Sequence, residues 1–176
     1  MSYGWIGEKV RLVPLDREKH LENAILWLND PEVTRWLLVD IPITRLQEER
    51  YFEENMVARE DRVQFAVETL GGEHIGFTGL FEINQRHRSC RSGIVIGPPS
   101  NWRKGYGLDA IRVRSRFAFE ALGLRLLLTE AMAENEASVR ALRKAGYREL
   151  GVLPKRYWRR GAFRDAVQFF LESPLG

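Results

Sequence analysis

The spacing of apolar and polar residues along the chain alternates between the period of a helix and that of a strand. Leu21, Ala24 and Leu28 recur at helical spacing, whereas residues 63–69 and 124–131 are short apolar runs typical of strands. The predicted helices cover residues 17–28, 44–59, 107–122 and 135–146. The predicted strands cover residues 10–15, 63–69, 75–83, 91–97 and 124–131, with further strands within 147–171.

Capping and turn residues fix how these elements follow one another. The predicted helix caps are Asp16, Thr44 with Gln47 as a capping box, and Asn135. Gly71-Gly72 and Arg160-Gly161 predict hairpin turns, and the strand–helix–strand order of residues 91–131 requires a parallel crossover. The order therefore predicts an α/β (α+β) fold with one mixed sheet and helices on both faces.

One side of the predicted helix over 107–122 carries charges at helical spacing. These residues are Asp109, Arg112, Arg116 and Glu120. The inward side is apolar and consists of Leu108, Ile111, Ala118, Phe119 and Leu122. We therefore expect the charged residues to form a solvated stripe.

A glycine-rich loop joins the strand over 91–97 to this helix. Gly105 and Gly107 allow the backbone to approach a ligand closely, and Arg103 and Lys104 lie beside them. The N–H groups at a helix N-terminus, together with local positive charge, favour an anion. The loop predicts a pyrophosphate cradle, and a plain turn is the alternative that the loop alone leaves open.

Length and composition predict one ordinary globular domain over residues 1–176. Hydrophobic residues make up 44% and charged residues 29% of the chain, and no apolar run is long enough to span a membrane. The single cysteine, Cys90, excludes an internal disulfide, and His20, His74 and His87 lack metal-ligand spacing. We expect a cytoplasmic protein with no metal and no membrane partner.

The formal net charge of +3 raises the question of nucleic acid as a partner. The basic residues are interspersed with acidic residues through most of the chain, and no helix-turn-helix, zinc-finger or RNA-recognition signature is present. We therefore expect the basic groups at 86–91 and 103–116 to serve a phosphorylated small molecule, with no nucleic acid as partner.

The glycine loop and a downstream segment together carry a family resemblance. Residues 102–107 read WRKGYG after a strand and a proline break, and residues 133–147 read AENEASVRALRKAGY. This arrangement resembles the GNAT superfamily of acyl-CoA-dependent N-acetyltransferases over nearly the whole chain, and is most similar to the RimJ/RimL-type branch, the ribosomal-protein N-terminal acetyltransferases and their relatives. The resemblance implies a largely antiparallel mixed sheet of about seven strands flanked by four helices, with a central parallel strand–helix–strand unit.

The resemblance also implies acetyl-CoA as the co-substrate and suggests which residues bind it. The expected diphosphate loop consists of Arg103, Lys104, Gly105, Tyr106, Gly107 and Leu108. The backbone of Ile94, Val95 and Ile96 would bond the pantetheine arm, and the N–H of Val95 is one candidate to face the thioester oxygen. Asn135 would contact the CoA arm, although its position as a helix N-cap is explanation enough.

Two positions depart from the pattern of the superfamily. Leu142 stands where many members carry a tyrosine general acid, and Ser92 stands where the branch often has a glutamate. The first departure argues against tyrosine-dependent polyamine acetyltransferases, although residues 82–87, EINQRH, resemble theirs. The second departure removes a carboxylate that the branch often has at this position.

The remaining catalytic candidates are a serine and two glutamates. Ser138 is the candidate to protonate the leaving thiolate, with helix capping as the equal alternative. Glu82, near the end of the third strand, is the first choice for a general base or an amine-orienting carboxylate, and Glu130 is the reserve. Most carboxylates at strand ends are simply solvated.

The acceptor is expected to contact the first helices. Trp27, Trp36, Tyr51 and Phe52 are the aromatic candidates, and Trp36 is the one assigned to substrate binding. Direct attack by an amine is expected, because no Cys–His or Ser–His pair is placed to form a covalent intermediate. A protein or peptide N-terminus is the expected acceptor. The alternatives are a small amine (an antibiotic, an amino acid or a polyamine) and a CoA-binding regulator without turnover. The resemblance also allows a homodimer.

Overall fold

The helices form where the sequence supplies a cap. In the computed structural model, which describes residues 5–175, Asp16 accepts hydrogen bonds from the N–H groups of Glu18 and Lys19, and Thr44 and Gln47 form the predicted capping box. The helices are α1 (Arg17–Leu28), α2 (Arg45–Asn55), α3 (Tyr106–Glu120) and α4 (Glu136–Lys144). Two short 3₁₀ turns, η1 (Val33–Trp36) and η2 (Pro99–Asn101), complete the helical elements of the described residues.

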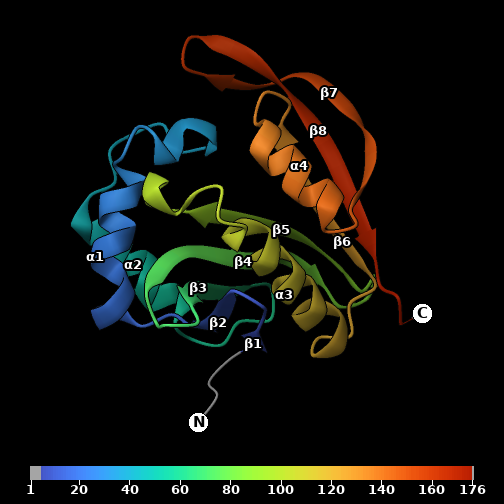
Figure 1. The fold of residues 1–176 in the computed structure, drawn as a ribbon, viewed down its shortest axis with the longest axis horizontal. Helices are drawn as coiled ribbons and strands as arrows, with labels where there is room; N and C mark the ends of the chain where they lie inside the picture. The colour runs from blue at the N-terminus through green and yellow to red at the C-terminus, as the bar shows by residue number, and fades with distance from the viewer. Residues whose placement is uncertain (1–4, 176) are drawn as a thin grey trace.

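The strands form one eight-stranded sheet in the order β1-β2-β3-β4-β5-β6-β8-β7 (Figure 1). They are β1 (Trp5–Ile6), β2 (Val10–Pro14), β3 (Val63–Thr69), β4 (His74–Asn84), β5 (Ser89–Ile96), β6 (Leu126–Met132), β7 (Arg148–Arg159) and β8 (Ala162–Glu172). β5 and β6 are parallel, and the other neighbouring pairs are antiparallel. The predicted fold class and the central parallel unit are confirmed.

The helices divide between the two faces of the sheet. Phe77 of β4 packs beside Trp27 of α1 and Phe52 of α2, whereas its neighbour Thr78 bonds to Arg114 of α3. Because successive side chains of a strand point to opposite faces, α1 and α2 cover one face, and α3 covers the other. Figure 1 shows α3 and α4 side by side, so both helices belong to this second face.

The main core lies between the sheet and the pair α3 and α4. Its buried members include Leu80, Ile111, Leu127, Leu142 and Phe169. A smaller core under α1 and α2 contains Leu21, Ala24 and Phe52. The sheet is thus closely covered on its α3/α4 face, while α1 and α2 protect only the part of the other face nearest β2–β4.

The structure differs from the sequence-based expectations mainly at element ends. The two-residue strand β1 was not predicted, and it raises the count from about seven strands to eight. α2 ends at Asn55 rather than at 59, and β5 begins at Ser89 rather than at 91. The single-domain prediction over 1–176 includes residues 1–4 and 176, which lie outside the described part, and it stays a prediction.

Candidate active site

The parallel strands β5 and β6 separate after only three paired residues. Pairing runs from Ser89 with Leu126 to Arg91 with Leu128, and beyond this point the hydroxyl of Thr129 donates to the carbonyl of Ser92 at 2.9 Å. The later residues of β5 have no backbone partner on β6 in this register. We call this divergence the fork. It leaves a row of main-chain polar groups of β5 available to a ligand.

The alternation of β5 determines which groups face the fork. The carbonyl of Ser92 points to β6, whereas that of Val95 lies against Gly76 of β4. N–H and C=O of one strand residue point the same way, so Ile94 and Ile96 face the fork and Val95 faces β4. Contrary to the expectation, the N–H of Val95 therefore points to β4 and not into the fork, whereas the N–H of Ile94 points into the fork.

Trp102, the first residue of the glycine-loop signature, is tied to the end of β5. Its indole N–H donates to the carbonyl of Ile96 at 2.6 Å. This bond fixes the start of the loop relative to the fork. It gives a physical reason for a tryptophan at the first signature position.

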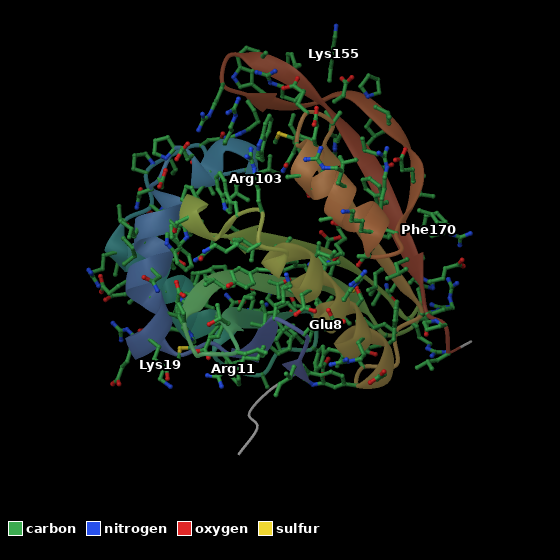
Figure 2. The ribbon with its side chains drawn as sticks, viewed as in Figure 1. Glu8, Arg11, Lys19, Arg103, Lys155 and Phe170 are labelled. Carbon is green, nitrogen blue, oxygen red and sulfur yellow. The ribbon has the colours of Figure 1, made fainter. Side chains whose placement is uncertain are left out.

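The glycine loop enters α3 through residues in the left-handed backbone conformation. Gly105 is the N-cap of α3 with φ +83°, it makes no side-chain cap hydrogen bond, and Arg103 before it also has a positive φ of +62°. The first N–H groups of a helix have no partners within the helix, so those of α3 remain available. A Cβ added at Gly107 would lie 3.7 Å from Cγ1 of Ile96, an ordinary contact distance. Figure 2 shows Arg103 between the ribbons of η1 and α4.

A further cation at this loop, Lys9, escaped the sequence analysis. Its Nζ donates to the carbonyl of Lys104 at 2.8 Å. Lys9 is held by Asp109, whose buried carboxylate accepts the N–H groups of Glu8, Lys9 and Val10 at 3.2, 2.7 and 3.0 Å. The expectation that Asp109 belongs to a solvated stripe is wrong, because α3 packs its first turn against the segment before β2.

The N-terminus of α4 lies at the same edge of the sheet as that of α3. β5 and β6 are parallel and each is followed by a helix, so both helices begin where these strands end. Asn135 caps α4 by accepting the N–H of Ser138 at 3.2 Å. Leu142 is buried in the main core at 3% exposure.

The face of the fork opposite α3 and α4 carries a cluster of charged side chains. Glu130 of β6, with 8% of its side chain exposed, forms ion pairs with Arg91 of β5 and with Arg156 of β7, the latter at 3.7 Å from Nε to Oε2. Phe81 is paired with Arg91 across β4 and β5, so this cluster shares the face of Phe77. Burial, with Glu130 beside it, raises the pKa of Tyr157 above its ordinary value. We call Arg91, Glu130, Arg156 and Tyr157 the acceptor-face cluster.

An irregularity in β7 aims Arg156 at Glu130. The register of β7 against β8 shifts between Leu153 and Tyr157, and Lys155 within this bulge has φ +51°. The N–H of Lys155 donates to Asp165 at 2.8 Å, and Figure 2 shows the Lys155 side chain pointing away from the molecule. A bulge changes the direction of the side chains beside it. Here it turns Lys155 outward and leaves Arg156 in contact with Glu130.

The hairpin of β7 and β8 is also fastened to the segment after α1. Arg159, 6% exposed, donates to the carbonyls of Thr34 and Val39 at 2.9 and 3.1 Å and pairs with Asp40. Trp36 lies within this segment, half-buried under the guanidinium of Arg35. Its assignment to the substrate stays a prediction. Trp27 and Phe52, by contrast, are core residues at 4% and 1% exposure.

Glu82 is not brought to the open side of the fork. It is an exposed bulge residue with φ +51°, between the pairs of Phe81 with Arg91 and of Asn84 with Ser89. Ile94 lies opposite Thr78, four residues before Glu82, or about 13 Å along the strand. Glu130, the reserve candidate, is the carboxylate that the structure places at the fork.

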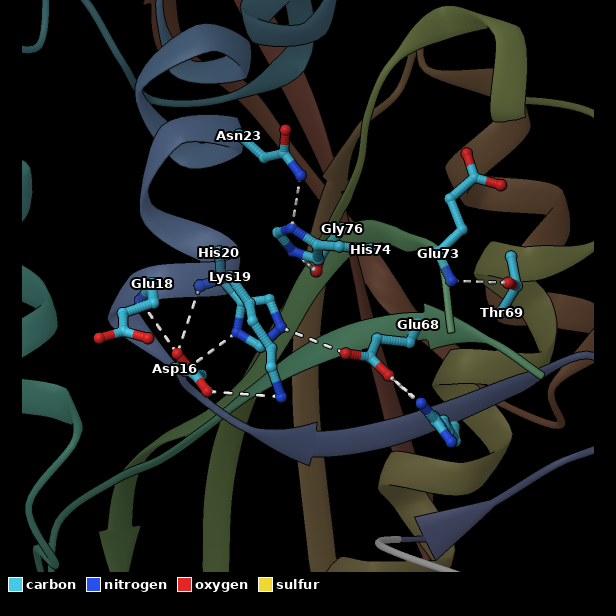
Figure 3. A network of polar contacts seen from close by, with 11 residues as sticks. Asp16, Glu18, Lys19, His20, Asn23, Glu68, Thr69, Glu73, His74 and Gly76 are labelled. Carbon is cyan, nitrogen blue, oxygen red and sulfur yellow. Dashed lines mark hydrogen bonds and ion pairs between the residues drawn. The ribbon is translucent and has the colours of Figure 1, made fainter. Parts of the chain in front are cut away.

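A second buried polar cluster lies beside α1 (Figure 3). His20 accepts the N–H of Asp16 at 2.9 Å on Nδ1, and its Nε2 lies 3.3 Å from Glu68. Arg11 bonds to the other oxygen of Glu68 at 2.8 Å. Burial opposes ionisation of Glu68, but the hydrogen bonds from Arg11 and His20 prevail and lower its pKa. Both oxygens of this carboxylate are thus satisfied.

The rings of His20 and His74 lie in contact in this cluster, tilted by 54° with 4.5 Å between centroids. The two nitrogens of His74 lie 3.0 Å from the side-chain nitrogen of Asn23 and 3.0 Å from the carbonyl of Gly76. Burial lowers the pKa of His20 and lowers that of His74 to about 4. Burial likewise raises the pKa of Cys90 to about 12, so its thiol is unsuited to nucleophilic chemistry.

Residues 5–175 contain no group of three His, Cys, Asp or Glu side chains that could hold a metal ion. None of the helices in the same part of the chain is long and apolar enough to cross a membrane.

Comparison with known families identifies the family of the chain. Residues 9–148 match the acetyltransferase (GNAT) domain family. The chain belongs to the GNAT acetyltransferase family. As the fold, the loop and this match imply, it is an acetyl-CoA-dependent N-acetyltransferase.

Individual relatives span several kinds of GNAT protein. An uncharacterized N-acetyltransferase of Bacillus subtilis is 32% identical over 58% of this chain, a match that covers 57% of that relative's length. The spermidine N(1)-acetyltransferase of Escherichia coli K12 is 28% identical over 92% of this chain and 85% of its own. The RimJ/RimL-type assignment is not among the findings and stays a prediction.

Solved structures share the fold. Spermidine N-acetyltransferase from Vibrio cholerae, crystallised with CoA and spermine, superimposes with a TM-score of 0.84 at 22% identity, covering 93% of this chain and 95% of that one. A GNAT acetyltransferase from Bacillus anthracis gives a TM-score of 0.81 at 19% identity over 95% and 96% of the two chains. At these identities the likeness concerns the fold alone.

Proposed function

We propose that this protein transfers an acetyl group from acetyl-CoA to the primary amine of a small molecule. The single observation that carries the proposal is the fork. Ile94 faces the side of β5 from which β6 has diverged, and Glu130 lies on β6 past the last paired residues, at the edge of the sheet where α3 and α4 begin. The named relatives that match most of the chain act on spermidine, and this favours a small amine over the peptide N-terminus expected from the sequence.

The residues on the α3/α4 face fit a CoA thioester. Arg103, Lys104 and Lys9 supply positive charge, and the N–H groups of Tyr106, Gly107 and Leu108 open α3. Acetyl-CoA supplies an activated acyl group when bound. Asn135 and the backbone of Ile94 and Ile96 would contact its pantetheine arm, as would Val95 by packing.

The reaction is a direct attack of the amine on the thioester carbon, with loss of the thiol. The N–H of Ile94 donates to the carbonyl oxygen as negative charge develops, a contribution of about 2–4 kcal/mol to the transition state. Glu130 accepts the proton that the amine loses, with Tyr157 beside it as a neutral donor. Ser138, at the N-terminus of α4, donates to the departing sulfur, and the helix dipole stabilises the thiolate.

Glu130 replaces Glu82 in this proposal as the base. Glu130 lies past the last paired residues of β5 and β6, whereas Glu82 lies on the paired side. A base at the fork reaches an amine that attacks between the strands. Glu82 and Trp36 remain candidates for contact with the outer part of the acceptor.

Substitution of Gly107 tests the proposal. Gly107→Glu puts a carboxylate into the cradle at a position whose φ is not in the left-handed region, and its Cβ meets Ile96 at an ordinary distance. We expect the Kd for CoA in calorimetry to rise at least a hundredfold, through loss of space and repulsion of the diphosphate. The melting temperature should change by only a few degrees.

Gly71→Glu is the matched control, because Gly71 lies in the β3–β4 turn where an added Cβ meets only Thr69 at 3.7 Å. Equal CoA affinity in the two variants would refute the cradle. Binding of acetyl-CoA without thiol release, across a panel of amines, would refute the proposed activity.

A further inference from the structure

The acceptor-face cluster contains more positive than negative charge. Arg91 and Arg156 contribute two guanidinium groups against the single carboxylate of Glu130. A polyamine would bring further positive charge to this place. Charge complementarity therefore disfavours an acceptor that is only cationic.

Within the cluster, Glu130 is incompletely bonded. Its Oε1 pairs with Arg91, but Oε2 is buried and has no hydrogen-bond partner among the described residues. A buried acceptor without a partner is costly and calls for an explanation. A substrate N–H that reaches Oε2 would satisfy it.

Arg156 is the side chain that covers this oxygen. Its Nε lies 3.7 Å from Oε2, beyond hydrogen-bonding distance, and 46% of the side chain is exposed. The guanidinium is thus held by charge and by contact with the Tyr157 ring at 5.2 Å, without a hydrogen bond to Glu130. It is free to exchange this position for a better anionic partner.

The backbone is distorted to place Arg156 here. A non-glycine residue with positive φ, Lys155, and a register shift in β7 both lie next to it. Such strain persists where the surrounding structure enforces it, and it gathers at functional sites. In a regular β7 the side chains would alternate between the two faces of the sheet without this local change of direction.

We propose that the acceptor is an amine carrying a carboxylate close to its nitrogen, as in an α-amino acid. Glu130 Oε2 accepts the amine N–H, and Arg156 binds the acceptor carboxylate as a bidentate partner. The neighbouring positions of one carboxylate and one guanidinium match an acceptor whose amine and carboxylate are one carbon apart. This inference rests on the proposed function and narrows its substrate class.

The test compares acceptors that differ only in the carboxylate. Thiol release from acetyl-CoA is measured with the twenty common amino acids, their carboxamides, and the amines putrescine and spermidine. We expect kcat/KM for at least one amino acid to exceed that of its carboxamide at least tenfold, and to exceed that of spermidine. The amine of the carboxamide is less basic than that of the amino acid, so a larger fraction of it is neutral at a given pH. A preference for the amino acid therefore cannot arise from a larger fraction of neutral amine.

Two arginine variants then locate the effect. Arg156→Gln should reduce the acid-to-carboxamide ratio to near one, mainly through KM, and Arg156→Glu should shift the preference toward putrescine. Arg125→Gln is the control: Arg125 directly precedes β6, at the end where β5 and β6 are paired, and 49% of its side chain is exposed. This variant makes the same change of charge away from Glu130 and should keep the acid-to-carboxamide ratio. CoA titration and melting temperature show whether each variant is folded.

The results separate this inference from the proposed function. Turnover of spermidine or carboxamides at least as fast as of the amino acids would overturn the carboxylate requirement while leaving a small-amine acetyltransferase. An acid preference that survives Arg156→Gln would overturn the role of Arg156. No thiol release with any amine, despite CoA binding, would overturn the proposed function itself.

Discussion

Glu68 on β3 and Glu130 on β6 are both buried carboxylates paired with arginine, yet their surroundings differ. Glu68 has a partner on each oxygen, Arg11 on one and His20 on the other, and Figure 3 shows the polar contacts continuing from His20 to Asp16. Glu130 is bonded on one oxygen only, and its second arginine stays at 3.7 Å. The two carboxylates have equally exposed side chains, 8% each, and both pair with an arginine, but they differ in how completely their oxygens are bonded.

The difference separates a structural carboxylate from one available for chemistry. A carboxylate with hydrogen bonds on both oxygens stabilises the fold but has no free oxygen for a ligand. Burial without such bonds would be costly, and here both oxygens already have partners. A carboxylate with an unused oxygen beside a divergence of strands is stabilised further when a substrate binds. Burial and charge alone do not distinguish the two cases.

Replacing Glu130 should give the largest effect. We expect Glu130→Gln to lower kcat by about a thousandfold, within the range for loss of a general base, because the amide cannot accept the amine proton. The Kd for CoA should stay within twofold, since the cradle lies on the other face of the sheet. A variant that keeps more than a tenth of the parent kcat would show that Glu130 is structural like Glu68.

Replacing Glu68 should affect stability instead. Glu68→Gln leaves Arg11 and His20 without the carboxylate, and we expect the free energy of unfolding to fall by about 3 kcal/mol in urea denaturation. The kcat of the folded fraction should be unchanged. Glu22→Gln, which removes an exposed pair with Arg45, is the control and should leave the free energy of unfolding almost unchanged. A fully folded Glu68→Gln variant with reduced kcat would show that Glu68, like Glu130, takes part in the reaction.

The stability conferred by the Glu68 cluster should also depend on pH. The folded pKa of His74 is about 4, below the unfolded value near 6.5, so the unfolded state binds more protons as the pH falls through this window. Stability contributed by neutral His74 is full above pH 6.5 and declines toward pH 4, by about 2 kcal/mol at pH 5. His20 adds to the decline with the same sign.

Comparing variants at two pH values isolates this contribution. The difference in unfolding free energy between pH 7.5 and pH 5 should shrink in His74→Gln relative to the parent, and should be unaltered in His87→Gln, where the exposed histidine has no part in the cluster. A parallel loss of stability in the parent and His74→Gln would mean that other groups dominate the acid response.

Local signals in the sequence predicted much of the fold. Asp16, Thr44 and Asn135 act as the expected caps, and β3 has the predicted bounds, because these features depend on residues that are neighbours in the chain. The edge strand β1 escaped prediction because a two-residue strand has no period of its own. Asp109 was misplaced because its partners lie about a hundred residues away in the chain.

The same difference between local and long-range signals applies to the candidate site. The CoA loop is a contiguous segment with a motif, so the sequence could indicate it. The acceptor-face cluster brings together β5, β6 and an irregular part of β7, and no spacing rule links Arg91, Glu130 and Arg156. Which N–H groups of β5 face the fork depends on the alternation of the strand. Ile94 can be chosen over Val95 only once the bond between Thr129 and Ser92 is known.

Arg159 has a consequence for how acceptor specificity can change. Its buried guanidinium donates to carbonyls of the segment after α1, so the C-terminal hairpin and residues 34–40 form a single interlocked unit from distant parts of the gene. A recombination that replaces only one of the two parts would leave the buried charge of Arg159 without its partners. It would lower the free energy of unfolding by several kcal/mol. Descendants of this chain would acquire new acceptors most readily through changes that preserve this joint, or through exchanges that carry both parts together.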